Sequence, residues 1–105
     1  MKWIETIELR TPDGEDALRA LDLKSLVANL SGASKPNEIV LLRHVSVNGD
    51  IAIHLLSDTD RMPPEGSELG LRLKEMLRGS GLVSHKIWIE SERYPDSETF
   101  PLTGS

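Results

Sequence analysis

The amino-acid sequence predicts an α+β domain in which two helices pack on a four-stranded antiparallel sheet. Two observations lead to this fold class. Segments with strand-like and helix-like patterns follow one another in the order β-α-β-β-α-β. The central hairpin, residues 38–58, is rich in aliphatic side chains on both faces, whereas a sheet with one face in water alternates to polar residues. The length of 105 residues allows one domain with one hydrophobic core.

The first part of the chain predicts a strand, a turn and a helix. Residues 3–10 alternate between two faces, and one face carries Trp3, Ile7 and Leu9 together with Glu5. The turn at residues 11–14 follows from the sequence Thr-Pro-Asp-Gly, because proline cannot donate to a strand ladder and Asp-Gly favours a turn. Aliphatic residues then recur at helical spacing up to residue 30. A glycine at position 32 suits the C-terminal cap of this helix.

The register of the hairpin follows from its turn. Asn48-Gly49 suits a two-residue type I′ turn, which places Val45 opposite Ala52 and Arg43 opposite His54. One face of the ribbon then carries Val40, Leu42, His44, Ser46, Ile51, Ile53 and Leu55. The other face mixes aliphatic and charged residues: Ile39, Leu41, Arg43, Val45, Val47, Ala52, His54, Leu56 and Asp58.

The remainder of the chain predicts a helix, a strand and a tail. Ser67 is the expected N-cap of the second helix, whose apolar stripe is formed by Leu69, Leu73, Met76 and Leu77. Residues 82–90 alternate as a fourth strand. Residues 1–92 are therefore expected to form a single α+β domain. Residues 93–105 contain prolines and little periodicity, which predicts an irregular C-terminal tail.

This element order predicts a specific topology. Right-handed crossovers give the strand order 4-1-3-2 with both helices on one face, which is the ferredoxin-like arrangement. The face expected to meet the helices carries Trp3, Ile7, Leu9, Val40, Leu42, Ile51, Ile53, Leu55, Val83, Ile87 and Ile89. The opposite face keeps many aliphatic residues and Trp88 among polar ones. Because an apolar face of that size usually marks an interface, we expect a homodimer through this sheet face.

The chain resembles the dimeric α+β barrel proteins, and among them the antibiotic-biosynthesis-monooxygenase-like group. The resemblance covers residues 3–90 and lies in the order and length of the elements, with the segments IELR, NGDIAIHLLSD and GSELGLRLKEMLRGSGLVSHKIWIE. It implies two ferredoxin-like subunits that pack sheet against sheet, with a small ligand between the sheet and its surroundings. It also implies a cofactor-independent oxygenase that acts on a small planar compound.

His54 is the strongest candidate for chemistry on the mixed face. The expected register places it beside Arg43, and the neighbouring first strand presents Thr6 and Glu8 on the same face. A histidine between a carboxylate and a guanidinium suits acid–base catalysis or contact with an anion. In an enzyme of this kind His54 is the proton acceptor and Arg43 the anion stabiliser. Trp88, with Thr6 and Glu8, then contacts the substrate.

The same residues also fit a protein without catalytic activity. Arg43, His54 and Glu8 suit a hydrogen-bonded patch that fixes the register of a dimer, and tryptophan is a common interface anchor. The alternative function is therefore a non-catalytic homodimeric module that binds a metabolite or another protein. A ligand-sized pocket beside His54 and Trp88 favours the enzyme, whereas a face filled by its partner favours the module.

Composition limits the remaining functions. The 12 basic and 17 acidic residues give a formal net charge of -5, and no Lys/Arg cluster is present, so no nucleic-acid partner is expected. The absence of cysteine excludes disulfides and thiolate chemistry. His44 and His54 fall on opposite faces and His85 on a strand at the far edge, so neither a metal site nor a cofactor is expected. No apolar segment approaches the roughly 20 residues that span a membrane, and we expect a cytoplasmic protein. The glutamates at positions 5, 8, 90 and 92 are expected to be solvated or salt-bridged.

Overall fold

The computed structural model describes residues 1–12, 14–30, 32 and 35–94. Its elements are β1 (Lys2–Arg10), α1 (Gly14–Ala20), α2 (Leu23–Ala28), β2 (Glu38–Arg43), β3 (Ile51–Asp58), α3 (Glu68–Leu77), the 3₁₀ turn η2 (Arg78–Ser80) and β4 (Leu82–Ile89). Residues 90–94 form neither helix nor strand, and the rest of the predicted tail, residues 95–105, lies outside the described residues.

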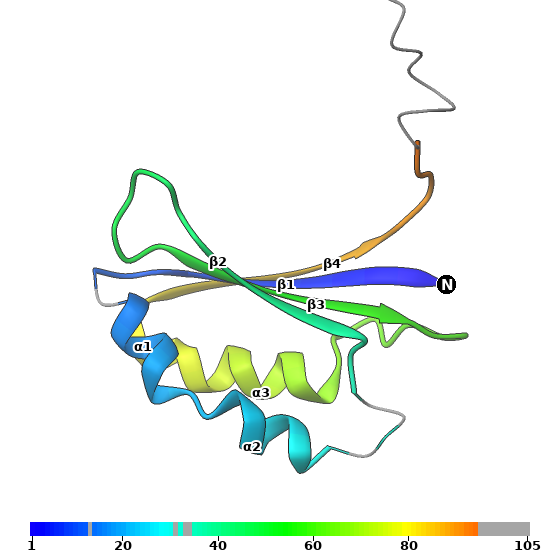
Figure 1. The fold of residues 1–105 in the computed structure, drawn as a ribbon, viewed down its shortest axis with the longest axis horizontal. Helices are drawn as coiled ribbons and strands as arrows, with labels where there is room; N and C mark the ends of the chain where they lie inside the picture. The colour runs from blue at the N-terminus through cyan, green and yellow to red at the C-terminus, as the bar shows by residue number, and fades with distance from the viewer. Residues whose placement is uncertain (13, 31, 33–34, 95–105) are drawn as a thin grey trace, which may run out of the picture.

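The four strands form one antiparallel sheet in the order β2-β3-β1-β4. This is the predicted order 4-1-3-2 read from the other edge. The helices α1, α2 and α3 all lie on one side of the sheet (Figure 1). The predicted α+β class with an antiparallel sheet is therefore confirmed. We call the side away from these helices the open face.

The prediction of a single helix over residues 15–30 is wrong, because the chain forms two short helices there. Leu21 closes the end of α1 by donating from its amide to the carbonyl of Leu18. Asp22 then caps α2, since its carboxylate accepts from the Ser25 amide at 3.2 Å and from the Ser25 hydroxyl at 2.7 Å. These two hydrogen bonds lower the pKa of the Asp22 carboxyl below its usual value. The helix ends at Ala28, before the predicted glycine cap.

The predicted two-residue turn at Asn48-Gly49 is also wrong. Arg43 pairs with Ile51 instead of His54, and Val40 pairs with His54. Residues 44–50 form the connection, which we call the arm. His44 closes it, because its amide donates to the Asp50 carbonyl at 3.0 Å, and its Nδ1 accepts from two backbone amides further along the arm.

This shift has a large consequence for β2, because side chains alternate with a period of two. The partner of Arg43 moves from residue 54 to residue 51, which is an odd number of positions, so every β2 side chain changes face. Val40 and Leu42 were expected under the helices, yet they lie on the open face with 37% and 39% exposure. Ile39 takes their place and packs against the core.

The core lies between β1, β3 and the helices. Six predicted inward residues are buried: Trp3, Ile7, Leu9, Ile51, Ile53 and Leu55. They pack against Leu69, Leu73 and Leu77 of α3, which are also buried. These three leucines confirm the predicted apolar stripe of that helix, whereas its fourth predicted member, Met76, is exposed. Ile89 was also expected on the inward face of the sheet, but it is 52% exposed near the end of the edge strand β4.

The arm is fitted tightly to the start of α1, which generates a prediction. Gly49 has a φ of +95°, and a Cβ there would lie 1.9 Å from the carbonyl oxygen of Thr11. Gly49→Ala should therefore lower the free energy of unfolding by about 1–3 kcal/mol. Gly79→Ala is the matched control, because a Cβ at Gly79 meets nothing within 4 Å. Urea denaturation of both variants measures the difference, and equal midpoints would show that the arm tolerates a side chain at this position.

Candidate functional site

The open face carries four of the five predicted site residues. Thr6 lies directly opposite His54 on one side and Lys86 on the other. Glu8, one row along, pairs with Ala52 and Ser84, so it is a diagonal neighbour of both His54 and Lys86. Thr6 is only 7% exposed although it faces away from the helices, whereas Glu8 and Lys86 are exposed.

Arg43 is the predicted site residue that the structure places elsewhere. It pairs with Ile51, whose side chain points into the core, so Arg43 lies on the side of β2 opposite to the His54 side. The expected Arg43–His54 pair is therefore not formed within the chain. The cation in the same row as His54 is Lys86, and Arg10 lies two rows along on the same face, with its Nε 3.6 Å from the Asp50 carboxylate.

Trp88 lies at the other end of the open face, in an apolar row. It pairs with Ile4, which in turn pairs with Leu56. The indole is 57% exposed. These three residues line a hollow of about 400 Å³, whose lining also includes five charged residues: Lys2, Glu38, Asp58, Glu90 and Arg93. That volume is sufficient for a small planar molecule beside the indole ring.

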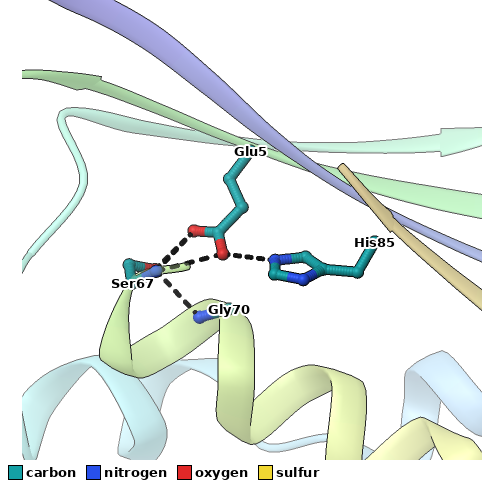
Figure 2. A network of polar contacts seen from close by, with 4 residues as sticks. All are labelled: Glu5, Ser67, Gly70 and His85. Carbon is teal, nitrogen blue, oxygen red and sulfur yellow. Dashed lines mark hydrogen bonds and ion pairs between the residues drawn. The ribbon is translucent and has the colours of Figure 1, made fainter. Parts of the chain in front are cut away.

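A second polar cluster lies on the helix side of the sheet and centres on Glu5 (Figure 2). Glu5 is fully buried. Its carboxylate accepts from the Ser67 amide at 3.1 and 3.2 Å and from the Ser67 hydroxyl at 2.5 Å. The Nε2 atom of His85 lies 2.5 Å from the other side of the same carboxylate. Ser67 is also the N-cap of α3, as predicted, because its hydroxyl accepts from the Gly70 amide at 3.0 Å.

Two glycines make room for this carboxylate. A Cβ at Gly70 would lie 2.0 Å from a Glu5 oxygen, and a Cβ at Gly66 would lie 2.6 Å from the ring of His85. Gly66 also has a φ of +120°, which other residues rarely adopt. The backbone of α3 can therefore approach Glu5 closely, and the positive end of the helix dipole favours the negative charge.

The cluster contains a serine, a histidine and an acid, but its order differs from that of a hydrolase triad. In a triad the histidine bridges the serine and the acid. Here Glu5 is the bridge, and the Ser67 hydroxyl donates to Glu5 while it accepts from the backbone. His85 therefore has no contact through which to activate Ser67. The geometry suits a structural role that joins β1, α3 and β4.

The sequence analysis missed this cluster, since it grouped Glu5 with solvated or salt-bridged glutamates. The signal was present in the pattern of β1. Glu5 alternates with Trp3, Ile7 and Leu9, so it had to point toward the helices. His85 alternates with Val83 and Ile87, which were expected on the helix side of β4, and a buried carboxylate on a helix-facing strand requires donors.

The described residues hold no group of three metal-ligating side chains that could bind an ion. In the same part of the chain, no helix has the length and apolar character required to cross a membrane. No family model, curated protein or solved structure matches this chain.

The buried carboxylate generates a prediction on stability. Glu5→Gln replaces one acceptor oxygen by an NH₂ group, which then faces a donor in a buried site. We expect the free energy of unfolding to fall by about 1–3 kcal/mol. Glu65→Gln is the control, since Glu65 is exposed and lies outside the sheet, and it should change stability by less than about 0.5 kcal/mol. Guanidinium denaturation of both variants gives the comparison; similar losses would mean that the Glu5 hydrogen bonds contribute little.

Proposed function

We propose that this protein is a non-catalytic homodimeric module that binds a small planar ligand on the open face. Its subunits are ferredoxin-like and pack sheet against sheet, as in the dimeric α+β barrel proteins that the sequence resembles. The observation that carries the proposal is the apolar character of the open face. Val40, Leu42 and Trp88 are 37%, 39% and 57% exposed on the side away from the helices. Aliphatic side chains in such an array favour burial against a partner.

The ligand site of this proposal is the hollow at Trp88. The exposed indole offers a flat surface for stacking, and Ile4 and Leu56 continue the apolar floor. Small-molecule sites combine apolar surface with polar groups that orient the ligand, and here charged side chains surround the apolar floor. A metabolite with an aromatic or quinone ring fits this arrangement better than a protein segment does, because the hollow is short and lies at one end of the sheet.

A cofactor-independent oxygenase on the same small planar compound is the second candidate. One observation favours it: His54 lies on the open face with Thr6 opposite and Glu8 diagonal to it. In this candidate His54 accepts a proton and Lys86, in place of Arg43, stabilises the resulting anion. The module is preferred because His54 pairs with Val40 and Thr6, and neither residue orients an imidazole for proton transfer as a directly paired carboxylate does.

The dimer prediction uses two neighbouring leucines of β2. Leu42→Asp places a charge in the proposed interface and should convert a dimer at micromolar concentration to a monomer. Leu41→Asp is the matched control, because Leu41 is 48% exposed and lies on the other side of the same strand. It should leave the dimer intact. Sedimentation equilibrium measures both, and a monomeric wild-type protein at this concentration would contradict the proposal.

The ligand prediction uses the difference between the two tryptophans. Trp3 is 4% exposed and Trp88 is 57% exposed, so a bound quinone should quench mainly the fluorescence of Trp88. We expect saturable quenching by 1,4-naphthoquinone in the wild type and its loss in Trp88→Ala, with the dimer retained. Oxygen uptake with 1,4-dihydroxynaphthalene, after subtraction of the uptake without protein, then separates the candidates: a protein-dependent uptake that His54→Ala abolishes would identify an oxygenase.

A further inference from the structure

The arm carries apolar side chains that the chain itself does not cover. It rises from the sheet on the open-face side, at the end where β2 stops and β3 begins (Figure 1). At its tip Val45 is 96% exposed, and Val47 is 46% exposed. The hydrogen bonds to His44 hold the tip in a defined conformation. An ordered arm with a bare aliphatic tip is suited to contact with another molecule.

We infer that the arm of each protomer reaches across the open face of its partner and covers the hollow at Trp88. This inference rests on the proposed dimer. The partner's arm thereby supplies one wall of the ligand site. The site is incomplete in a single chain, because its floor of Ile4, Leu56 and Trp88 is open on the side away from the sheet.

Two identical sheets with aligned strands can be stacked about a two-fold axis in two ways. We call each set of residues that pair across the four strands a row. In the first, the rows of the two sheets are reversed, so that the arm end of one protomer lies over the Trp88 end of the other. In the second, the rows are kept, so that both arms lie at the same end of the dimer. The side chains on the open face distinguish the two arrangements.

With reversed rows, the charges are complementary. Glu8 of one protomer lies over Thr6 of the other, next to Lys86, so that symmetry creates two Glu8–Lys86 pairs. With the rows kept, Lys86 lies over Val40, next to Glu38 on the same face of β2, and Glu8 lies over Ala52, next to His54. Lys86 therefore has a carboxylate neighbour in both arrangements, and the choice between them depends on the apolar side chains.

Apolar contacts favour reversed rows, because kept rows place Trp88 over Glu38 and Leu42 over Ser84. Val40 and Leu42 lie in successive rows of β2, and reversal places Val40 of each protomer over Leu42 of the other. Leu82, which is 75% exposed at the arm end of β4, then meets the Trp88 end of the partner's β4. Both contacts remove exposed aliphatic surface from water.

The arm also supplies area that the flat sheet lacks. Four strands spaced about 4.8 Å apart and about eight residues long give a face of roughly 500 Å². A stable interface usually buries about 800 Å² on each partner. An arm that overhangs the far end of the second sheet contributes to the remaining area on both sides of the dimer.

Because the chain has no cysteine, introduced cysteines report the arrangement directly. Val45→Cys places a thiol at the arm tip, and Glu38→Cys places one at the rim of the Trp88 hollow. These positions lie at opposite ends of β2, roughly 17 Å or more apart, so they cannot form a disulfide within one chain. The double variant should form a covalent dimer on mild oxidation, whereas either single variant alone should not.

The distance between two spin labels, one on Val45→Cys of each protomer, provides the second measurement. This substitution should not disturb the fold, because Val45 is almost fully exposed. Reversed rows place the two labels at opposite ends of the dimer, more than roughly 30 Å apart, whereas kept rows place them within about 20 Å. A short distance in a protein that sediments as a dimer would overturn this inference and leave the proposed dimer standing. A monomer in sedimentation would overturn both.

Discussion

The structure depends on one buried carboxylate that accepts hydrogen bonds from two other elements. Glu5 sits in the apolar face of β1, where an acceptor without donors would be costly. Its donors come from the first residues of α3 and from the middle of β4. These three elements must therefore meet at one point, which fixes where α3 begins and how it approaches the sheet. The glycines at positions 66 and 70 are consequences of the same constraint, because any side chain there would occupy the space of the carboxylate or its histidine.

Most strands and the last helix could be predicted because their signals are local. Strands β1, β3 and β4 alternate strictly, and Ser67 caps α3 with its own hydroxyl. The hairpin register could not be predicted, since it depends on a distant contact. Asn48-Gly49 favours a tight turn, but a Cβ at Gly14 would lie 1.7 Å from the carbonyl oxygen of Gly49. The arm thus packs against the start of α1, and tertiary packing overrides the preference of the dipeptide.

This single error explains which site residues were placed correctly. Thr6, Glu8, His54 and Trp88 lie on β1, β3 and β4, whose alternation determines their face, and they share the open face. Arg43 lies on β2, whose face depends on the register of the hairpin, so an odd shift moved it to the other side. The predicted strand order already placed β4 beside β1, but it did not give the register of that pair, which sets Lys86 opposite Thr6.

Polar groups on the two faces of the sheet differ in whether they have partners within the chain. On the helix side, Glu5 is bonded to Ser67 and His85 of the same chain. On the open face, within the described part of the chain, Glu8 and Lys86 form no ion pair with one another or with other residues. A surface that pairs with its own copy about a two-fold axis must carry each charge together with its complement. The open face does so, and it holds both signs one row apart among aliphatic residues. In a single chain both side chains are exposed to water, and the proposed dimer would bring Glu8 of one copy next to Lys86 of the other.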